Sequence, residues 1–272
     1  MRALSQVKPA LLFLLLVCTS ATASPLADSV LRASPVDAIV AQYPAMMSQG
    51  VREGLNQSGR VEPFVANTVS SIVSNAFSVD EIRAQVVEDL DQGLSDQQLD
   101  SVLGWYQTPL AERITQAEIA ASRPAAWEKV EAAAADLQDN YRGSERAKLF
   151  DRFDRAARAT ESTVDTTVAV QLGLASTLAV FNGSEGPTFE QLQQKIESQR
   201  DTLRAMVARQ VYIGYLYTYQ DLNTSELKDY IGFLESDSGS AFVRVVTNSI
   251  QRSITDPVES VGSQLTRFFN PG

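Results

Sequence analysis

Apolar residues recur at helical spacing along most of the chain, and this pattern limits the fold more than any other feature. Leu99, Val102, Leu103 and Tyr106 follow the i, i+3, i+4, i+7 stripe of one helix face. Comparable stripes occupy residues 36–47, 61–77, 82–90 and 258–268. Residues 168–174 alternate and are compatible with a strand, but the helical patterns on both sides favour a helix there. We therefore predict an all-α fold.

The first residues have the pattern of a secretory signal peptide. Arg2 and Lys8 precede an apolar run over residues 11–17, and small residues follow up to Ala23. Lipid attachment at Cys18 would need a small residue before it, where a valine stands. The apolar run is too short to cross a membrane, and no later stretch approaches that length. We expect cleavage after Ala23, a periplasmic location and no membrane span.

The expected mature chain contains neither cysteine nor histidine, which excludes several kinds of chemistry. Disulfides are impossible, so burial has to hold the fold together. Zinc loses its preferred ligands, and nucleophile–histidine pairs cannot form. The 23 basic residues fall to 21 against 33 acidic ones once Arg2 and Lys8 are removed, a net charge of −12. Such acidity disfavours nucleic acid as a partner. We expect no metal, no cofactor and no catalytic residues.

The chain divides into a leader and two similar parts. Residues 1–23 are the signal peptide, and the short polar segment 24–34 is expected to be a flexible leader. Helical repeat 1 covers residues 35–142 and helical repeat 2 covers residues 143–272, with a break near Gly143.

The two parts match at one constant offset, which is the step from Leu94 to Leu222. Leu222–Ile250 and Leu94–Ser122 each predict two short helices joined by a tight corner. At this offset Leu99 matches Leu227 and Trp105 matches Phe233. Agreement at both ends without a gap favours duplication of a whole helical unit. We expect two similar bundles or one fused pseudo-symmetric bundle.

The second corner resembles the signature of a bacterial family of exported, all-helical domains of unknown function. That signature is Glu-Leu, five residues, Phe-Tyr, any residue, Ser-Pro, any residue, Gly. In the second corner it is carried by Glu226, Leu227, Phe233, Ser236 and Gly239. In the first corner, Leu99, Trp105, Tyr106 and Pro109 stand at its positions, although Trp105 departs from the expected Phe. The resemblance implies a periplasmic helical domain and carries no activity.

Two short motifs suggest chemistry, and each has a structural alternative. Ser225 and Lys228 fit S-x-x-K, the nucleophile motif of penicillin-interacting serine enzymes, but they also fit the first turn of a helix. Residues 89–93 resemble the opening of a calcium loop, but they also fit the end of a helix before a glycine. In both cases the structural reading is favoured.

Tyr212, Tyr215 and Tyr219 share one face of a predicted helix. They either belong to the core with their hydroxyls at its rim or line a groove for a peptide or an apolar ligand. Gly104 and Gly232 occupy equivalent positions inside predicted helices, which predicts a close approach of neighbouring helices there.

These patterns favour a non-catalytic, exported module that binds a protein or an apolar small molecule. A hydrolase that uses Ser225 and Lys228 is the first alternative, and a structural factor of envelope stress is the second.

Overall fold

The computed structural model describes residues 24–58, 63–181 and 188–269, and every regular element within these ranges is a helix. The fold is therefore all-α, as the sequence predicts. The helices are α1 (Pro25–Ala33), α2 (Val36–Val40), α3 (Tyr43–Ser58), α4 (Pro63–Ala76), α5 (Val79–Gly93), α6 (Asp96–Tyr106), α7 (Pro109–Ser122), α8 (Pro124–Tyr141), α9 (Glu145–Ala157), α10 (Ala159–Phe181), α11 (Phe189–Glu197), α12 (Arg200–Thr218), α13 (Thr224–Glu235) and α14 (Asp237–Phe269).

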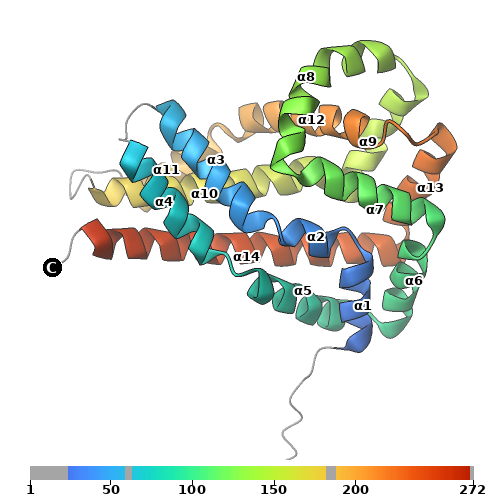
Figure 1. Ribbon diagram of the computed structural model, residues 1–272, viewed down its shortest axis with the longest axis horizontal. Coiled ribbons are helices and arrows are strands. Elements are labelled where there is room, and N and C mark those ends of the chain that lie inside the picture. The colour runs from blue at the N-terminus through green and yellow to red at the C-terminus, as the bar shows by residue number, and fades with distance from the viewer. Residues whose placement is uncertain (1–23, 59–62, 182–187, 270–272) are drawn as a thin grey trace, which may run out of the picture.

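The long helix α14 is the spine of the molecule. It contacts α10 along its length and also packs against α4, α5, α6, α9 and α13. Figure 1 shows α7, α8, α9, α12 and α13 gathered toward one end of this spine, and α3, α4 and α11 toward the other. The two sequence corners, α6–α7 and α13–α14, therefore lie at the same end of the spine.

The predicted helix starts are formed by side-chain caps. Ser95 accepts from the Gln98 amide, and the Gln98 side chain accepts from the Ser95 amide, which makes a capping box. Asn223 and Glu226 form the equivalent box at the start of α13. Ser78 accepts from the amide of Glu81 at the start of α5. These caps satisfy amide groups that the first helical turn leaves without partners.

The segment expected to be a flexible leader is instead a helix, α1. Ser24 caps it by accepting from the Leu26 amide at 3.2 Å. Ala27, Val30 and Leu31 are buried against the core, and α1 packs on α5 and α6. These three residues have the i, i+3, i+4 spacing of one helix face, so even a short polar segment presents a complete apolar stripe.

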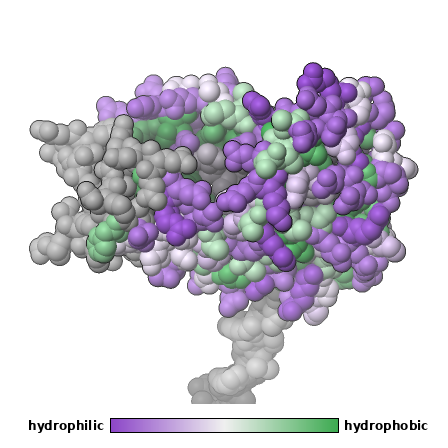
Figure 2. All heavy atoms as spheres, turned by 45° about the horizontal axis from the view of Figure 1, so that its top comes forward, coloured by the Kyte–Doolittle hydropathy of each residue, from purple (hydrophilic) through white to green (hydrophobic). Residues whose placement is uncertain are grey.

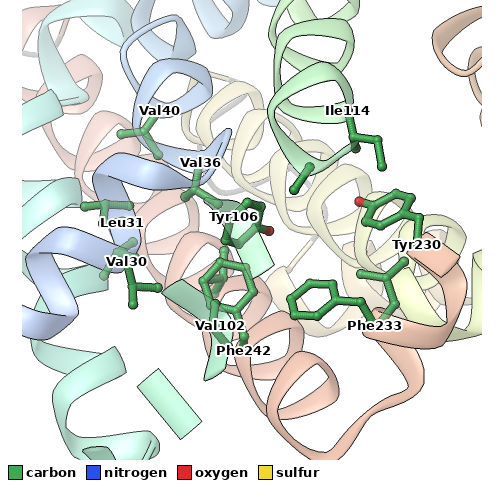
Figure 3. Packing of buried hydrophobic residues seen from close by; sticks show 14 of the residues in the cluster. Val30, Leu31, Val36, Val40, Val102, Tyr106, Ile114, Tyr230, Phe233 and Phe242 are labelled. Carbon is green, nitrogen blue, oxygen red and sulfur yellow. The ribbon is translucent and has the colours of Figure 1, made fainter. Parts of the chain in front are cut away.

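A single buried cluster contains residues of both predicted repeats. Figure 3 shows Val102 and Tyr106 of α6 converging with Phe233 of α13 and Phe242 of α14. The two halves therefore share one core, as a fused bundle would. The surface is mainly hydrophilic in the view of Figure 2, with scattered hydrophobic patches.

The duplication itself stays a prediction, and the helices agree with it only in part. The starts of α13 and α14 follow those of α6 and α7 at the same offset that relates the two sequence corners. Upstream the correspondence breaks down, because α2 and α3 are separate helices whereas their counterpart α10 is continuous. The same holds downstream, where α7 and α8 correspond to the single helix α14. The corners are thus the most alike parts of the two halves.

Candidate functional site

The two corners are built by the same hydrogen bond. In the first, the Thr108 hydroxyl accepts from the Ala111 amide at 3.2 Å. In the second, the Ser236 hydroxyl accepts from the Gly239 amide at 3.1 Å and donates to the Phe233 carbonyl at 2.6 Å. A hydroxyl at this position satisfies a free amide of the new helix and turns the chain at once. These two hydrogen bonds therefore explain in structural terms why the motif has a serine at position 236.

Gly239 is required because the second corner is very tight. A Cβ atom added there would lie 1.9 Å from the Phe233 carbonyl oxygen. The first corner is more open, since Ala111 occupies the equivalent position with a buried side chain. The prediction for Gly104 and Gly232 is wrong: both are exposed, and an added Cβ would meet nothing within 4 Å. The close approach is at the corner and not within the helices.

Aromatic rings join the two corners. Trp105 of the first corner stacks on Phe233 of the second, with ring centroids 4.7 Å apart and planes 7° apart. Trp105 is also parallel to Tyr230 at 6.3 Å, and Tyr106 meets Phe233 edge-on at 5.8 Å. We call Trp105, Tyr106, Phe153, Tyr219, Tyr230 and Phe233 the aromatic junction.

A carboxylate lies inside this aromatic junction. The same Glu118 oxygen, Oε1, accepts from the Tyr219 hydroxyl and from the Tyr230 hydroxyl, both at 2.6 Å. Glu118 comes from α7, Tyr219 follows α12, and Tyr230 lies on α13. One side chain of the first half therefore holds two helices of the second half through short hydrogen bonds.

Burial dominates the ionisation of these groups. It raises the pKa of Glu118 above its ordinary value, although both tyrosine hydrogen bonds act in the opposite direction. Burial, and then the charge of Glu118, raise the pKa of Tyr230 and Tyr219 well above 10. Tyr106 is shifted in the same direction for the same two reasons. For all four groups, burial therefore shifts the equilibrium toward the neutral form.

Arg146 of α9 anchors the end of α12 beside the aromatic junction. The side chain is buried and donates to the main-chain carbonyls of Tyr219 and Leu222. Its guanidinium lies over the Tyr141 ring at 5.0 Å, while the Tyr215 hydroxyl donates to the Arg146 carbonyl at 2.9 Å. A cation at the carbonyl end of a helix is favoured by the helix dipole. Arg146 thus acts as a C-terminal cap supplied by another helix.

The three tyrosines proposed as binding residues are mostly in the core. Tyr215 and Tyr219 are buried, with 2% and 4% of their surface exposed. Tyr212 is partly exposed and packs edge-on against Phe150 at 4.9 Å. Their placement agrees with the core reading, and their aromatic neighbours occupy the face on which a groove would have opened.

The other motif residues also have packing or capping roles. Leu99 and Leu227 are fully buried at equivalent positions of α6 and α13. Glu226 completes its capping box and pairs with Arg113 of α7, so it also ties α13 to the first half. Pro109 is the first residue of α7, where its missing amide costs nothing.

Ser225 and Lys228 lie at the surface of the fold. Both are exposed on the first turns of α13, and the Ser225 amide donates to Asn223 at 2.9 Å as part of the cap. Lys228 lies near Glu145, whose pKa is lowered first by its hydrogen bond to Lys148 and to a smaller extent by the Lys228 charge. This placement fits the capping reading of the S-x-x-K pattern.

An open groove runs between the end of α5 and the middle of α14. It has a volume of about 480 Å³ and is lined by Asp89, Gln92, Gly93, Val245, Asn248, Gln251 and Arg252. An added Cβ on Gly93 would lie 2.7 Å from Val245 Cγ2, so the helices touch where the groove begins. The calcium-like segment 89–93 therefore forms one wall of the groove.

Asp89 and Arg252 form an ion pair in this groove. Burial acts to raise the pKa of Asp89, but the neighbouring Ser249 hydroxyl, the Arg252 guanidinium and the Gln85 amide outweigh it, so the pKa lies below its ordinary value. The Asp89 side chain is 13% exposed and the Arg252 side chain 60%. Asp89 is therefore a fixed anion, whereas Arg252 keeps an accessible guanidinium edge.

The part of the chain that the structure describes has no side-chain cluster suited to a metal ion and no helix suited to crossing a membrane. Within it, no three acidic side chains come together in a way that could hold a metal ion. No helix in these ranges has both the length and the apolar character that crossing a bilayer requires.

Residues 80–140 match the model of a family described as uncharacterized protein conserved in bacteria (DUF2059). The match covers α5, the first corner and almost all of α8, whereas the sequence motif is more complete in the second corner. The likeness to a bacterial family of unknown function is therefore confirmed over residues 80–140, whereas the motif and its presence in two copies stay predictions. Comparisons with curated proteins and with solved structures found no match.

Sequence reasoning missed Glu118, Arg146 and the groove. Glu118 sits among Ile119, Ala120 and Ala121 near the end of α7, and an acid in an apolar helix end is a weak signal for a buried carboxylate. Arg146 occupies a strongly charged helix start, where nothing distinguishes it from the exposed Arg152 or Arg155.

Proposed function

We propose that the chain is an exported, non-catalytic helical module that binds a partner protein in the periplasm. The observation that supports this most is the use of Glu118. It is the carboxylate with a raised pKa, which is the property expected of a general acid. Yet both of its tyrosine partners are buried, and its contacts join α7 to α12 and α13. Its perturbed ionisation follows from packing.

The residues suggested for a hydrolase support the same proposal. Ser225 and Lys228 are exposed on a capped helix turn, without the enclosure that a nucleophile and its base usually have. An all-helical protein with a mixed surface and an open groove is suited to recognition by contact.

The export part of the proposal has a direct test. The chain, produced with its own first 23 residues in a Gram-negative host, should be recovered from the periplasmic fraction. Mass spectrometry should then show an N-terminus at Ser24, the residue that follows Ala23. Recovery of the uncleaved chain from the cytoplasm would contradict export.

The non-catalytic part is tested with a serine-reactive covalent probe. The mature chain should remain unlabelled at Ser225, as should a Ser225→Ala variant used as the blank. Labelling of the native chain that disappears in this variant and in Lys228→Ala would instead establish the hydrolase.

A further inference from the structure

The two ends of the groove between α5 and α14 present different groups. At the Gly93 end, α5 terminates with no basic residue in its last turn. The carbonyl groups of a final helical turn carry partial negative charge. At the opposite end the accessible edge of Arg252 is a hydrogen-bond donor. The end of α5 therefore attracts a cationic group of any ligand that spans the groove.

Amide side chains occupy the middle of the groove. Gln92 and Asn248 are exposed and face it from opposite walls, and Gln251 adds a third amide. An amide both donates and accepts, which matches the groups of a peptide main chain. The lining contributes no aromatic ring, so a flat apolar ligand has no surface on which to stack.

The dimensions favour a short extended segment. From Val245 to Arg252 the helix α14 rises about 10 Å, at about 1.5 Å per residue. An extended chain advances about 3.3 Å per residue, so about three residues fit along the groove. The whole chain carries a net charge of −10, which favours a basic partner over an acidic one.

We propose that this groove binds an extended, lysine- or arginine-bearing segment of a partner protein, with the basic side chain at the end of α5. The inference rests on the proposed function as an interaction module and names the site and the chemistry of its partner. The peptide main chain lies between Gln92 and Asn248, and Arg252 contacts a carbonyl oxygen or a carboxylate of the segment.

Three capped peptides test the chemistry: acetyl-Ala-Lys-Ala-Lys-Ala-amide and its glutamate and glutamine counterparts. Backbone amide NMR of the mature chain should show shifts at residues 89–94 and 245–252 with the lysine peptide. The glutamate peptide should produce no shifts there, and added salt should weaken the lysine peptide. Shifts of equal size with all three peptides, or shifts mapped elsewhere, would overturn the proposal.

Charge variants of exposed residues locate the site without disturbing the core. Gln92→Lys and Asn248→Lys should each lower the affinity for the lysine peptide at least five-fold. The exposed Gln107 at the end of α6 supplies the matched control, because Gln107→Lys makes the same change of net charge and should alter the affinity less than two-fold. Equal losses of affinity in all three variants would show that the lysine peptide is attracted to the acidic chain as a whole and does not bind in the groove. If tri-N-acetylglucosamine binds at the groove and the lysine peptide does not, the ligand of the groove is a glycan and not a peptide.

A photo-crosslinking residue separates this inference from the proposed function. It is placed in the exported chain at Asn248, and at the exposed Gln116 and Glu131 on α7 and α8 as other surfaces. An adduct at position 248 that Gln92→Lys abolishes supports both the groove as the binding site and the proposed interaction module. Adducts from position 116 or 131 alone overturn the groove and keep the interaction module, and the absence of adducts at all three contradicts the interaction module itself.

Discussion

Trp105 and Phe233 stand at equivalent positions of the two corners, and their rings stack with centroids 4.7 Å apart. In a pair of units related by a two-fold axis, equivalent residues meet only at the axis. The stack therefore marks the place where such an axis would pass through the fold. The two halves meet through the very residues that the sequence motif contributes from each.

The stack should be measurable as a coupling between the two halves. Replacing Trp105 and Phe233 with alanine, singly and together, should give an interaction free energy of about 0.5–1.5 kcal/mol in chemical unfolding. Trp127 of α8 is the matched control, because the Trp127→Ala and Phe233→Ala changes should be additive. Additive effects of the Trp105 and Phe233 changes would mean that their contact does not stabilise the junction.

The second corner should tolerate no side chain at Gly239. The added Cβ of Gly239→Ala would collide with the Phe233 carbonyl, and the chain would have to open the corner to relieve it. We expect a loss of about 3 kcal/mol in the free energy of unfolding. Gly232→Ala gives the opposite result, a gain of about 0.5–1 kcal/mol, because that exposed helical glycine has free space around it. Similar effects of the two changes in urea unfolding would contradict the tight corner.

Much of this architecture follows from local sequence signals. The capping boxes at Ser95 and Asn223 involve residues a few positions apart, so the sequence alone locates the start of α6 and α13. Pro44 likewise marks the interruption of the first apolar stripe, and the chain breaks between α2 and α3 just before it. Signals of this kind depend on no knowledge of the tertiary fold.

The parts that could not be predicted depend on distant residues. Glu118 meets Tyr219 and Tyr230 across 101 and 112 residues, and no periodicity encodes such a meeting. The glycine prediction failed for a different reason: Gly104 and Gly232 share a repeat position on exposed helix faces, whereas the close contact is a local one, between Gly239 and the carbonyl six residues before it. The α1 stripe was overlooked because three apolar residues in a polar segment gain meaning only once a core is present to receive them.

Arg146 should be among the most important charged residues for stability. Arg146→Met keeps the length of the side chain but removes its donors to the Tyr219 and Leu222 carbonyls. Hydrogen bonds from charged groups are worth about 1.5–3 kcal/mol each, so we expect a loss of about 3 kcal/mol or more. Arg209→Met on the exposed side of α12 should cost less than about 0.5 kcal/mol. A thermal or urea unfolding series of both variants makes the comparison, and equal losses would contradict the capping role.

Glu118 should give the fold a dependence on pH that its substitutions expose. Because the folded chain raises the pKa of Glu118, the fold binds this proton more tightly than the unfolded chain does. The stability that Glu118 contributes is therefore fully present below the pKa that it has in the unfolded chain. This stability is lost as the pH rises through the pKa that Glu118 has in the folded chain. Glu118→Gln retains an oxygen that can accept both tyrosine hydroxyls but has no charge to bury. The stability of the Glu118→Gln chain relative to the native chain should rise with pH between these two pKa values and then level off.

The measurement is urea unfolding of both chains between pH 4 and pH 8. Glu112→Gln on the exposed side of α7 serves as the control, and its difference from the native chain should not increase in the same direction. Glu118→Ala should instead cost about 2–4 kcal/mol, because it leaves two buried hydroxyls without an acceptor. A stability of Glu118→Gln that falls with pH relative to the native chain would mean that the fold favours the ionised carboxylate. The raised pKa assigned to Glu118 would then be wrong.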